Sequence, residues 1–407
     1  MNKDFNLNKI YQTLLIILAF LMPLTVFGAN LIIVIICLLW LLSGEYTSKF
    51  NQIIDNKFIL ASILFFSLHV LGLLWTQNLN WGLHIVHKMW YFLLLLPVLF
   101  TIVRKDYIKF YISAFLLAIT FTEIASYLVW FEVVEPFKNA TVRNPTPFMS
   151  HISYNPILAF ATYLVLHKVF FNKKLTKLMF SFYSLFGLTM TFNMFITGGR
   201  AGQVSFFVML SILIFQFFDY QKIKSLIVIF IVVPGIFLSS YLLSDIFKDR
   251  VDMAIDEVAT FSVTKGFDPI TQSHTSVGVR LAMTLNSWEV IKKNPLIGIG
   301  TGDFPTEYAK INQINTPKLP NAENPHNMYI LVLMQLGLLG LSSMLIMIYY
   351  QIRLSFNSPV KLIRDVGITL PLMFLVIMLS DTYLLGHYTT LMYVFFSAFL
   401  CKDFEKS

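Results

Sequence analysis

The chain has 407 residues, of which 57% are hydrophobic and only 13% are charged, and its mean hydropathy is +0.70. This composition excludes an ordinary soluble globular fold, because so apolar a chain takes a lipid bilayer as its solvent. The net charge of +8 fits loops that meet anionic lipid headgroups and is not evidence for nucleic acid. Two distant cysteines, Cys37 and Cys401, provide neither a disulfide framework nor zinc-ligand spacing.

Long apolar windows recur along the whole sequence. Most cover about 18 to 22 residues, which at roughly 1.5 Å per residue crosses a hydrocarbon core of about 30 Å. We therefore expect an all-α polytopic membrane protein with about 12 transmembrane helices. The expected spans are 10–27, 29–42, 58–75, 90–103, 110–131, 154–171, 178–196, 201–218, 226–243, 327–350, 366–380 and 389–400. A cleaved signal peptide is the alternative for the first window, but the many further spans favour a retained helix.

The distribution of lysine and arginine predicts the orientation of these spans. Most of the 30 basic residues lie in short loops on one side, and such loops stay in the cytoplasm. Both termini are therefore expected to be cytoplasmic, with the long polar segment after Leu243 on the outer side. The expected organisation is residues 1–243 with nine spans, an outer loop at 244–325 that carries part of the active site, and residues 326–407 with three spans, all within one membrane domain.

The outer loop is long enough to be functional rather than merely connecting. Apolar residues at helical spacing over 245–258 predict an amphipathic helix at the membrane surface. A second helix is expected over 277–293, since Ser276 is a good N-cap and Asn294-Pro295 ends the pattern. Both helices would lie on the outer face of the membrane.

His326 is the candidate general base. Asn324 as N-cap and Pro325 at the first helical position predict that His326 lies in the first turn of the next span. The positive end of that helix would disfavour a second proton, leaving a neutral imidazole suited to proton abstraction. The alternative is an interfacial histidine that only caps its helix.

Arg200 lies in the glycine-rich turn Thr197-Gly-Gly-Arg200-Ala-Gly202, between two expected spans. Glycines allow a ligand to approach the backbone, a helix N-terminus attracts anions, and guanidinium pairs with phosphate oxygens. The alternative is an arginine that snorkels to the interface. Arg280, on the outer helix, is the second candidate, with a solvated loop arginine as its alternative. Together the two arginines would bind a diphosphate.

Other polar groups are secondary candidates. His84, His87 and Lys88 form a polar stripe at the outward end of the fourth span, where ionisable groups are functional candidates. We take His84, Lys88 and Asn327 as secondary ligands. Asp381 and His387, in the last outward loop, are weaker candidates.

The segment from Gly298 to Phe304 contains three glycines in alternation. It lacks the strand and helix context of a nucleotide-binding motif. We expect a flexible turn that shapes a cleft.

Three of these segments, in this order and spacing, resemble the O-antigen ligase and polymerase superfamily. The matching motifs are Thr197-Gly-Gly-Arg200-Ala-Gly202, then Arg280 with Trp288 and Asn294-Pro-Leu-Ile-Gly298-Ile-Gly300, and then Pro325-His326-Asn327 with Gln335-Leu-Gly337-Leu-Leu-Gly340.

The resemblance implies a membrane glycosyltransferase with a GT-C-like architecture and a large periplasmic loop, located in the bacterial inner membrane. It implies a donor glycan on undecaprenyl diphosphate, no metal and no cofactor. By this resemblance Arg200 and Arg280 bind the donor diphosphate and His326 activates the acceptor.

The preferred reading is an O-antigen ligase whose acceptor is the lipid A-core oligosaccharide. An O-antigen polymerase and a protein O-oligosaccharyltransferase would use the same chemistry and stay open as alternatives. A membrane transporter is the alternative from a different class. Its ionisable residues would line a path at the midplane, whereas here they gather at the outward ends of the spans.

Overall fold

The computed structural model describes residues 2–260 and 276–404. Within this part the chain is helical, and one isolated bridge joins Thr141 to Asn144. The all-α class is therefore confirmed. The helices are α1 Asn2–Leu21, α2 Val26–Leu42, α3 Tyr46–Asp55, α4 Lys57–Leu71, η1 Gly72–Leu74, α5 Leu79–Trp90, η2 Tyr91–Leu95, α6 Leu96–Ile102, η3 Lys105–Tyr107, α7 Ile108–Trp130, α8 His151–Phe171, α9 Lys177–Phe195, α10 Arg200–Phe217, α11 Lys222–Leu243, α12 Asp245–Thr260, α13 Ser276–Lys293, α14 Phe304–Asn315, α15 Met328–Phe356, α16 Lys361–Ile377 and α17 His387–Leu400.

Every expected span overlaps one of these helices. Among the described residues, seven helical segments are long and apolar enough to cross a membrane, or eight if α2 and α3, which bend by 116°, form one span. This supports a polytopic membrane protein but does not confirm a count of twelve, because helices such as α17, with 14 residues, are short for a bilayer. The fourth span begins earlier than expected, because α5, η2 and α6 form one segment from Leu79 to Ile102.

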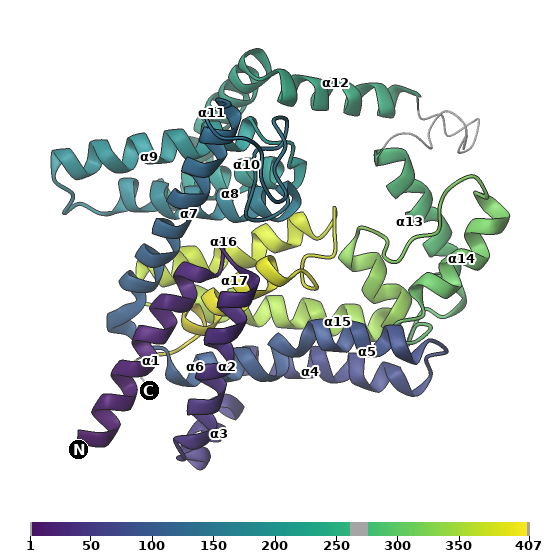
Figure 1. Cartoon of the computed structure of the whole chain (residues 1–407), viewed down its shortest axis with the longest axis horizontal. Helices are drawn as coiled ribbons and strands as arrows, with labels where there is room; N and C mark the ends of the chain where they lie inside the picture. Colours follow the sequence, from purple (N-terminus) through teal and green to yellow (C-terminus); the bar gives the residue numbers. More distant parts are fainter. Residues whose placement is uncertain (1, 261–275, 405–407) are drawn as a thin grey trace.

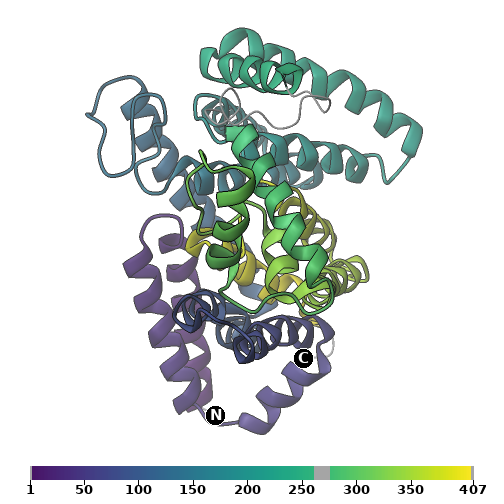
Figure 2. The same cartoon turned by 90° about the vertical axis from the view of Figure 1, so that its right-hand side faces the viewer.

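The two ends of the molecule differ in character. Both termini lie on the left of Figure 1, and α13 and α14 lie on the right. Figure 2 looks onto that right-hand end and shows α13 and α14 lying across its middle. Helices α13 and α14 thus share one end of the bundle, away from both termini.

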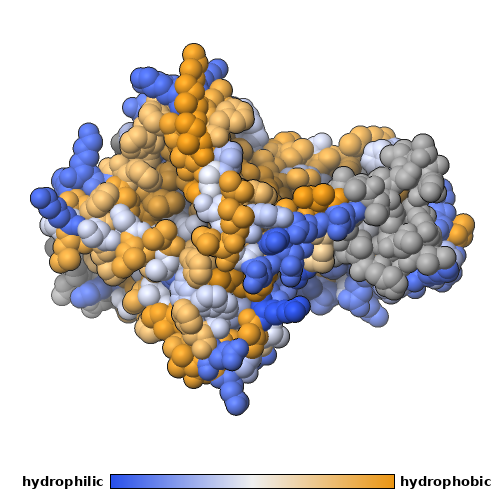
Figure 3. All heavy atoms as spheres, turned by 90° about the horizontal axis from the view of Figure 1, so that it is seen from above, coloured by the Kyte–Doolittle hydropathy of each residue, from blue (hydrophilic) through white to orange (hydrophobic). Residues whose placement is uncertain are grey.

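Helices α17 and α11 occupy opposite environments. Every residue of α17 from Thr389 to Leu400 is buried, and its phenylalanines pack against Phe115, Phe160 and Tyr111. A helix that is apolar all round belongs in a core or in lipid. Helix α11 instead faces lipid, because no residue of its most apolar stretch is buried within the protein. Broad hydrophobic areas cover much of the face shown in Figure 3, with hydrophilic residues at projecting ends and in a cluster near the middle of the view.

The outer segment follows the predicted helices closely. The helix expected over 245–258 is α12, and the helix expected over 277–293 is α13. Helix α14 was not expected, because the spacer after Gly302 carries no strong periodic pattern. Its start is marked only by Pro305 near the first helical position.

The glycine-rich segment is not a flexible turn, and that expectation is wrong. Gly298 has a φ of +69°, and Gly337 interrupts α15 with a φ of +59°. The interrupted helix exposes backbone groups, which pair with residues 295–300 through Ile299 N to Met334 O, Gly300 N to Gln335 O, Leu338 N to Pro295 O and Leu339 N to Leu296 O, at 2.8 to 3.1 Å. We call this pairing the main-chain brace. A Cβ on Gly298 would lie 2.4 Å from the Gln335 backbone, so glycine permits the contact.

The main-chain brace continues into the membrane helices. Thr301 N donates to the carbonyl of Gly72 at 3.1 Å, and the Asp303 carboxylate accepts from Gln77 N, Asn78 N and the Thr76 hydroxyl at 2.7 to 3.0 Å. These bonds fix the segment between α13 and α14 against α4, α5 and α15. The position of α13 over the helix bundle follows from this attachment.

Candidate functional site

His326 lies just before α15 rather than in its first turn, so the predicted position is wrong. Asn327 is the N-cap, and its side-chain oxygen accepts from Ile330 N at 3.1 Å. The Asn324 side chain instead accepts from His326 N at 2.9 Å, which closes a local turn. His326 adopts a φ of +49°. Non-glycine residues pay of order 1 to 3 kcal/mol for such conformations, which cluster at functional sites.

The imidazole of His326 is paired with a carboxylate. Its Nδ1 lies 3.3 Å from Oδ1 of Asp381, in the loop between α16 and α17. Burial raises the pKa of Asp381, but the hydrogen bond from His326, the Thr382 backbone N–H and the charge of Arg280 outweigh it and lower the pKa below 3.8. An ionised carboxylate only accepts hydrogen bonds, so Nδ1 is the donor, and the neutral form of the ring would keep its lone pair on Nε2.

Three arginines meet in one cavity of about 200 Å³. Arg200 begins α10, Arg250 lies on α12 and Arg280 lies on α13, so the two predicted residues share a lining with a third that the sequence did not single out. All three side chains are partly buried. Their position in one cavity matches what an anion with several oxygens requires.

Local packing fixes Arg200 at this cavity. Asn155 of α8 donates to the carbonyl of Gly199 at 3.1 Å and accepts from the Thr197 hydroxyl at 2.6 Å. A Cβ on Gly202 would lie 2.3 Å from the backbone of Asn155. Gly202 therefore allows α10 to approach α8 closely. The sequence had predicted that this glycine would allow a ligand to approach the backbone.

Gly198 lies between Asn144 and Arg250. A Cβ on Gly198 would lie 2.6 Å from Oδ1 of Asn144, so glycine permits the close approach of Asn144, whereas Nη2 of Arg250, at 3.5 Å, is in ordinary van der Waals range. His151, at the start of α8, also lines the cavity. Burial and the charge of Arg250 lower the pKa of His151. The ring is therefore neutral near pH 7, and the arginines supply the positive charge of this part of the cavity.

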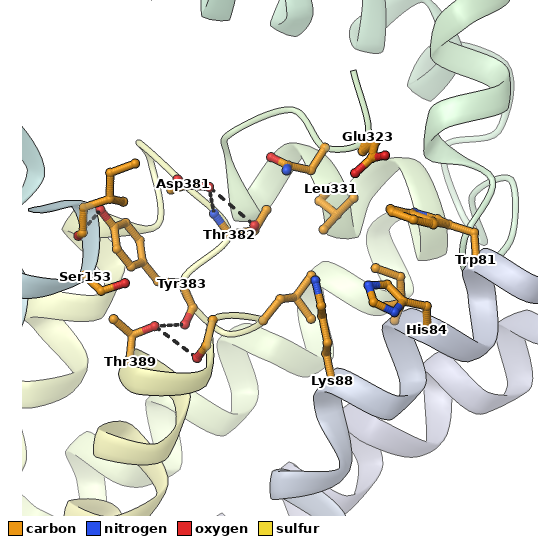
Figure 4. Close-up of a pocket in the computed structure, with 15 residues that line it drawn as sticks. Trp81, His84, Lys88, Ser153, Glu323, Leu331, Asp381, Thr382, Tyr383 and Thr389 are labelled. Atoms are coloured by element: carbon orange, nitrogen blue, oxygen red, sulfur yellow. Dashed lines mark hydrogen bonds between the residues drawn. The ribbon is translucent and has the colours of Figure 1, made fainter. Parts of the chain in front are cut away.

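A second cavity, of about 240 Å³, adjoins the first (Figure 4). Trp81, His84 and Lys88 of α5 line one side, with the His84 ring 4.9 Å from that of Trp81. Ile152 and Tyr383 line both cavities. Other lining residues of the second cavity are Glu323, Asn324, Asp381 and Thr382. His326 is not among the residues that line either cavity, but its hydrogen-bond partner Asp381 lines the second one.

The secondary candidates separate into two groups. His84 and Lys88 face the second cavity, whereas His87 is not among its lining residues. Asn327 caps α15, and its side-chain amide donates to Leu379 O at 3.2 Å. These two contacts indicate a structural role for Asn327. Among residues 2–260 and 276–404, no group of three or more His, Cys, Asp or Glu residues is arranged to hold a metal ion.

Sequence reasoning undervalued Asp381 and missed Arg250. Asp381 lies 55 residues after its histidine partner, and no local pattern marks that pairing. Arg250 lies on the polar face of an amphipathic helix, where an arginine usually serves solubility. The feature that points to Arg250 is its position beside Gly198, and that position depends on tertiary packing.

Comparison with known proteins bears on the central part of the chain. Residues 185–345 match the family model described as O-Antigen ligase. This range contains Arg200, Arg250, Arg280 and His326, whereas Asp381 and the α5 residues lie outside it. No curated protein sequence matches the chain. Over residues 185–345, which hold all three motifs of the resemblance, the chain is therefore similar to the O-antigen ligase family.

Proposed function

We propose that this protein transfers a glycan from undecaprenyl diphosphate to a hydroxyl of the lipid A-core oligosaccharide, as an O-antigen ligase. One observation carries the proposal: the arginine-lined cavity shares Ile152 and Tyr383 with a second cavity, and Asp381, the hydrogen-bond partner of His326, lines that second cavity. A transferase that joins two large substrates needs an anion site for the leaving group, a base, and a place for the acceptor. The family match supports the same reading.

The arginine-lined cavity is the site for the donor diphosphate. Arg200 and Arg280 would contact the phosphate oxygens, with charge-assisted hydrogen bonds worth roughly 1.5 to 3 kcal/mol each. As the bond from the anomeric carbon to the diphosphate oxygen breaks, negative charge collects on the diphosphate. Cations already in place stabilise that charge without reorganisation.

His326 is the general base for the acceptor. Its Nε2 removes the proton from the acceptor hydroxyl while that oxygen forms a bond to the anomeric carbon. Asp381 holds Nδ1–H and stabilises the imidazolium that results. A single displacement of this kind inverts the anomeric centre. The second cavity, with His84 and Lys88, would receive the acceptor saccharide.

The proposal assigns the reaction to the periplasmic face of a bacterial inner membrane. Its basis is the expected cytoplasmic position of the basic loops, together with the position of α13 and α14 at the end away from both termini (Figure 1). The proposed partners are the lipid-linked donor, the lipid A-core acceptor and membrane lipids. The outer loop at 244–325 would supply both Arg250 and Arg280 to the donor site.

The lipopolysaccharide of a deletion strain tests the proposed acceptor. Core oligosaccharide without attached chains supports the ligase. Core bearing a single repeat indicates an O-antigen polymerase instead. An unchanged profile contradicts both and redirects attention to protein O-glycosylation or to transport. Complementation with a His326→Ala variant should fail to restore chains, and restoration would contradict the assigned base.

A further inference from the structure

The second cavity contains a cation that no side chain of the cavity neutralises. Lys88 of α5 lines this cavity, and Figure 4 shows its side chain extending into the space. Among residues 2–260 and 276–404, its ammonium group forms no hydrogen bond and no ion pair. Glu323 and Asp381 line the same cavity, but neither carboxylate pairs with Lys88. The ammonium group is therefore available to a ligand.

The depth of Lys88 in the helix bundle argues for a role in the cavity. Lys88 lies roughly 14 Å along α5 from Leu79, within the candidate membrane span Leu79–Ile102. Ionisable groups within such spans face the protein interior or a water-filled cavity, where they mark the path of a substrate. A lysine that snorkels to the membrane surface would instead lay its stem along lipid. The position of Lys88 in the cavity lining fits a substrate contact.

An aromatic wall stands beside this cation. The ring centroids of Trp81 and His84 lie 4.9 Å apart, with an angle of 33° between the ring planes, and both residues line the cavity. An aromatic surface packs against the apolar face of a sugar ring, while a few polar groups around it fix the orientation. A cavity of roughly 150 Å³ holds one benzene ring, so a volume of about 240 Å³ has room for one pyranose with its substituents.

The charges of the lining select the kind of anion. Lys88 is the one lysine or arginine among the described residues that line this cavity, and Glu323 and Asp381 supply two carboxylates. The pKa of Asp381 is lowered, so its carboxylate is ionised near pH 7. A phosphate monoester carries a charge of about −1.5 to −2 at pH 7 and would face both carboxylates with one cation to balance it. A sugar carboxylate carries a single charge, which one ammonium group balances.

We propose that the second cavity selects an acceptor sugar that carries a carboxylate, and that Lys88 is the specificity-determining residue that binds this carboxylate. The inference rests on the proposed function, since it names the chemical class of the acceptor ring. Lys88 enters the cavity from α5, whereas Asp381 enters from the loop between α16 and α17 (Figure 4). A uronic acid on the aromatic wall places its carboxylate at Lys88 and a ring hydroxyl on the side of the His326–Asp381 pair.

Binding of single sugars to the purified full-length protein in phosphatidylcholine nanodiscs tests this inference. Saturation-transfer NMR measures the Kd of methyl glycosides in the gluco, galacto and manno configurations. Each configuration is offered in three forms that differ only at C6, namely the neutral hexoside, the uronoside and the hexoside 6-phosphate. In at least one configuration the uronoside should bind about tenfold more tightly than the neutral form, and more tightly than the phosphate.

These comparisons need no mutation. Equal affinity for uronoside and neutral hexoside in every configuration overturns the proposal, and so does a failure to bind any of these sugars. Tighter binding of the 6-phosphate overturns the assignment of a carboxylate.

Substitutions at position 88 connect the preference to the ammonium group. Lys88→Met keeps the length of the side chain and should abolish the preference, while the Kd of the neutral hexoside stays within about twofold of wild type. Lys88→Arg keeps the charge and should retain most of the preference. Lys292→Met is the matched control, because Lys292 is an exposed lysine of the outer helix α13 that lines neither cavity. A Lys88→Met protein that still prefers the uronoside, or a Lys292→Met protein that loses the preference, overturns the role of Lys88.

The outcomes separate this inference from the proposed function. Loss of attached chains in the deletion strain, combined with no preference for a uronoside, overturns the carboxylate site and leaves the ligase standing. Uronoside binding that depends on Lys88, combined with an unchanged lipopolysaccharide profile, leaves the carboxylate site standing and overturns the proposed function.

Discussion

Nδ1 of His326 lies 3.3 Å from Oδ1 of Asp381, and this contact joins the residue before α15 to the loop before α17. The carboxylate is additionally held by Thr382 N at 2.7 Å. Two loops that close the same end of the bundle therefore set the direction of the imidazole. We expect the pairing to control the tautomer of His326 and hence the availability of Nε2.

Asp381→Asn should lower kcat by about 10²-fold with little change in KM for the donor, because it leaves the shape but loses the charge that fixes Nδ1–H. Steady-state transfer assays measure kcat and KM separately. Asp252→Asn is the control, since Asp252 accepts from the Tyr241 hydroxyl away from the two cavities. An Asp381→Asn enzyme with wild-type kcat would contradict the orienting role.

Arg280→Ala should reduce turnover on the order of 10²-fold, as expected for the loss of one donor to developing charge. Arg280→Lys should recover only part of this activity, since an ammonium group cannot form the paired contacts of a guanidinium. Arg353→Ala serves as control, because Arg353 is an exposed residue of α15 that packs on the ring of Tyr349 and so lies on another helix than Arg280. Full activity in Arg280→Ala would remove this residue from the donor site.

Glycan transfer should continue in excess chelator. Diphosphate is a good leaving group, and the arginines would neutralise its charge where other transferases use a divalent ion. The measurement is the rate of transfer before and after chelation. Loss of activity that magnesium or manganese restores would show that the arginines do not suffice.

The Asp381 carboxylate predicts a specific dependence of stability on pH. Its pKa is lowered in the folded protein, so its contribution to stability is present above the unfolded value of 3.8 and is lost as pH falls through the lower folded value. Thermal unfolding should therefore show a difference between wild type and Asp381→Asn that is still present at pH 5. The difference should shrink only below about pH 4. A difference that disappears by pH 5 would contradict the lowered pKa.

Gly337→Ala should destabilise the protein by about 1 to 3 kcal/mol, because the residue has a positive φ and its Cβ would lie 2.4 Å from the Leu296 backbone. Thermal unfolding in detergent measures the effect. Gly235→Ala is the matched control in a transmembrane helix, since its Cβ would meet nothing within 4 Å. It should be neutral or slightly stabilising, and an equal loss in both variants would contradict the tight packing at Gly337.

Local patterns in the sequence predicted much of the fold. Apolar runs located the membrane helices, and helical spacing with N-cap chemistry gave α12 and α13 nearly to the residue. His326 was misplaced because two asparagines compete as caps, and the sequence does not rank Asn327 above Asn324. The segment that begins at Gly298 was misread for a different reason, since its main-chain partners lie in α15, distant in the sequence. Arg250 and Asp381 likewise became visible only when packing brought them to the cavities.

Main-chain groups, together with the Asp303 carboxylate, hold the connection that places α13 over the bundle. Leu296 and Ile297 are 66% and 53% exposed, so their identities contribute little to that connection. Homologous chains would therefore be free to vary Leu296 and Ile297 to suit different bilayers, while the orientation of Arg280 stays the same. In this region the backbone geometry fixes the identity of the glycines.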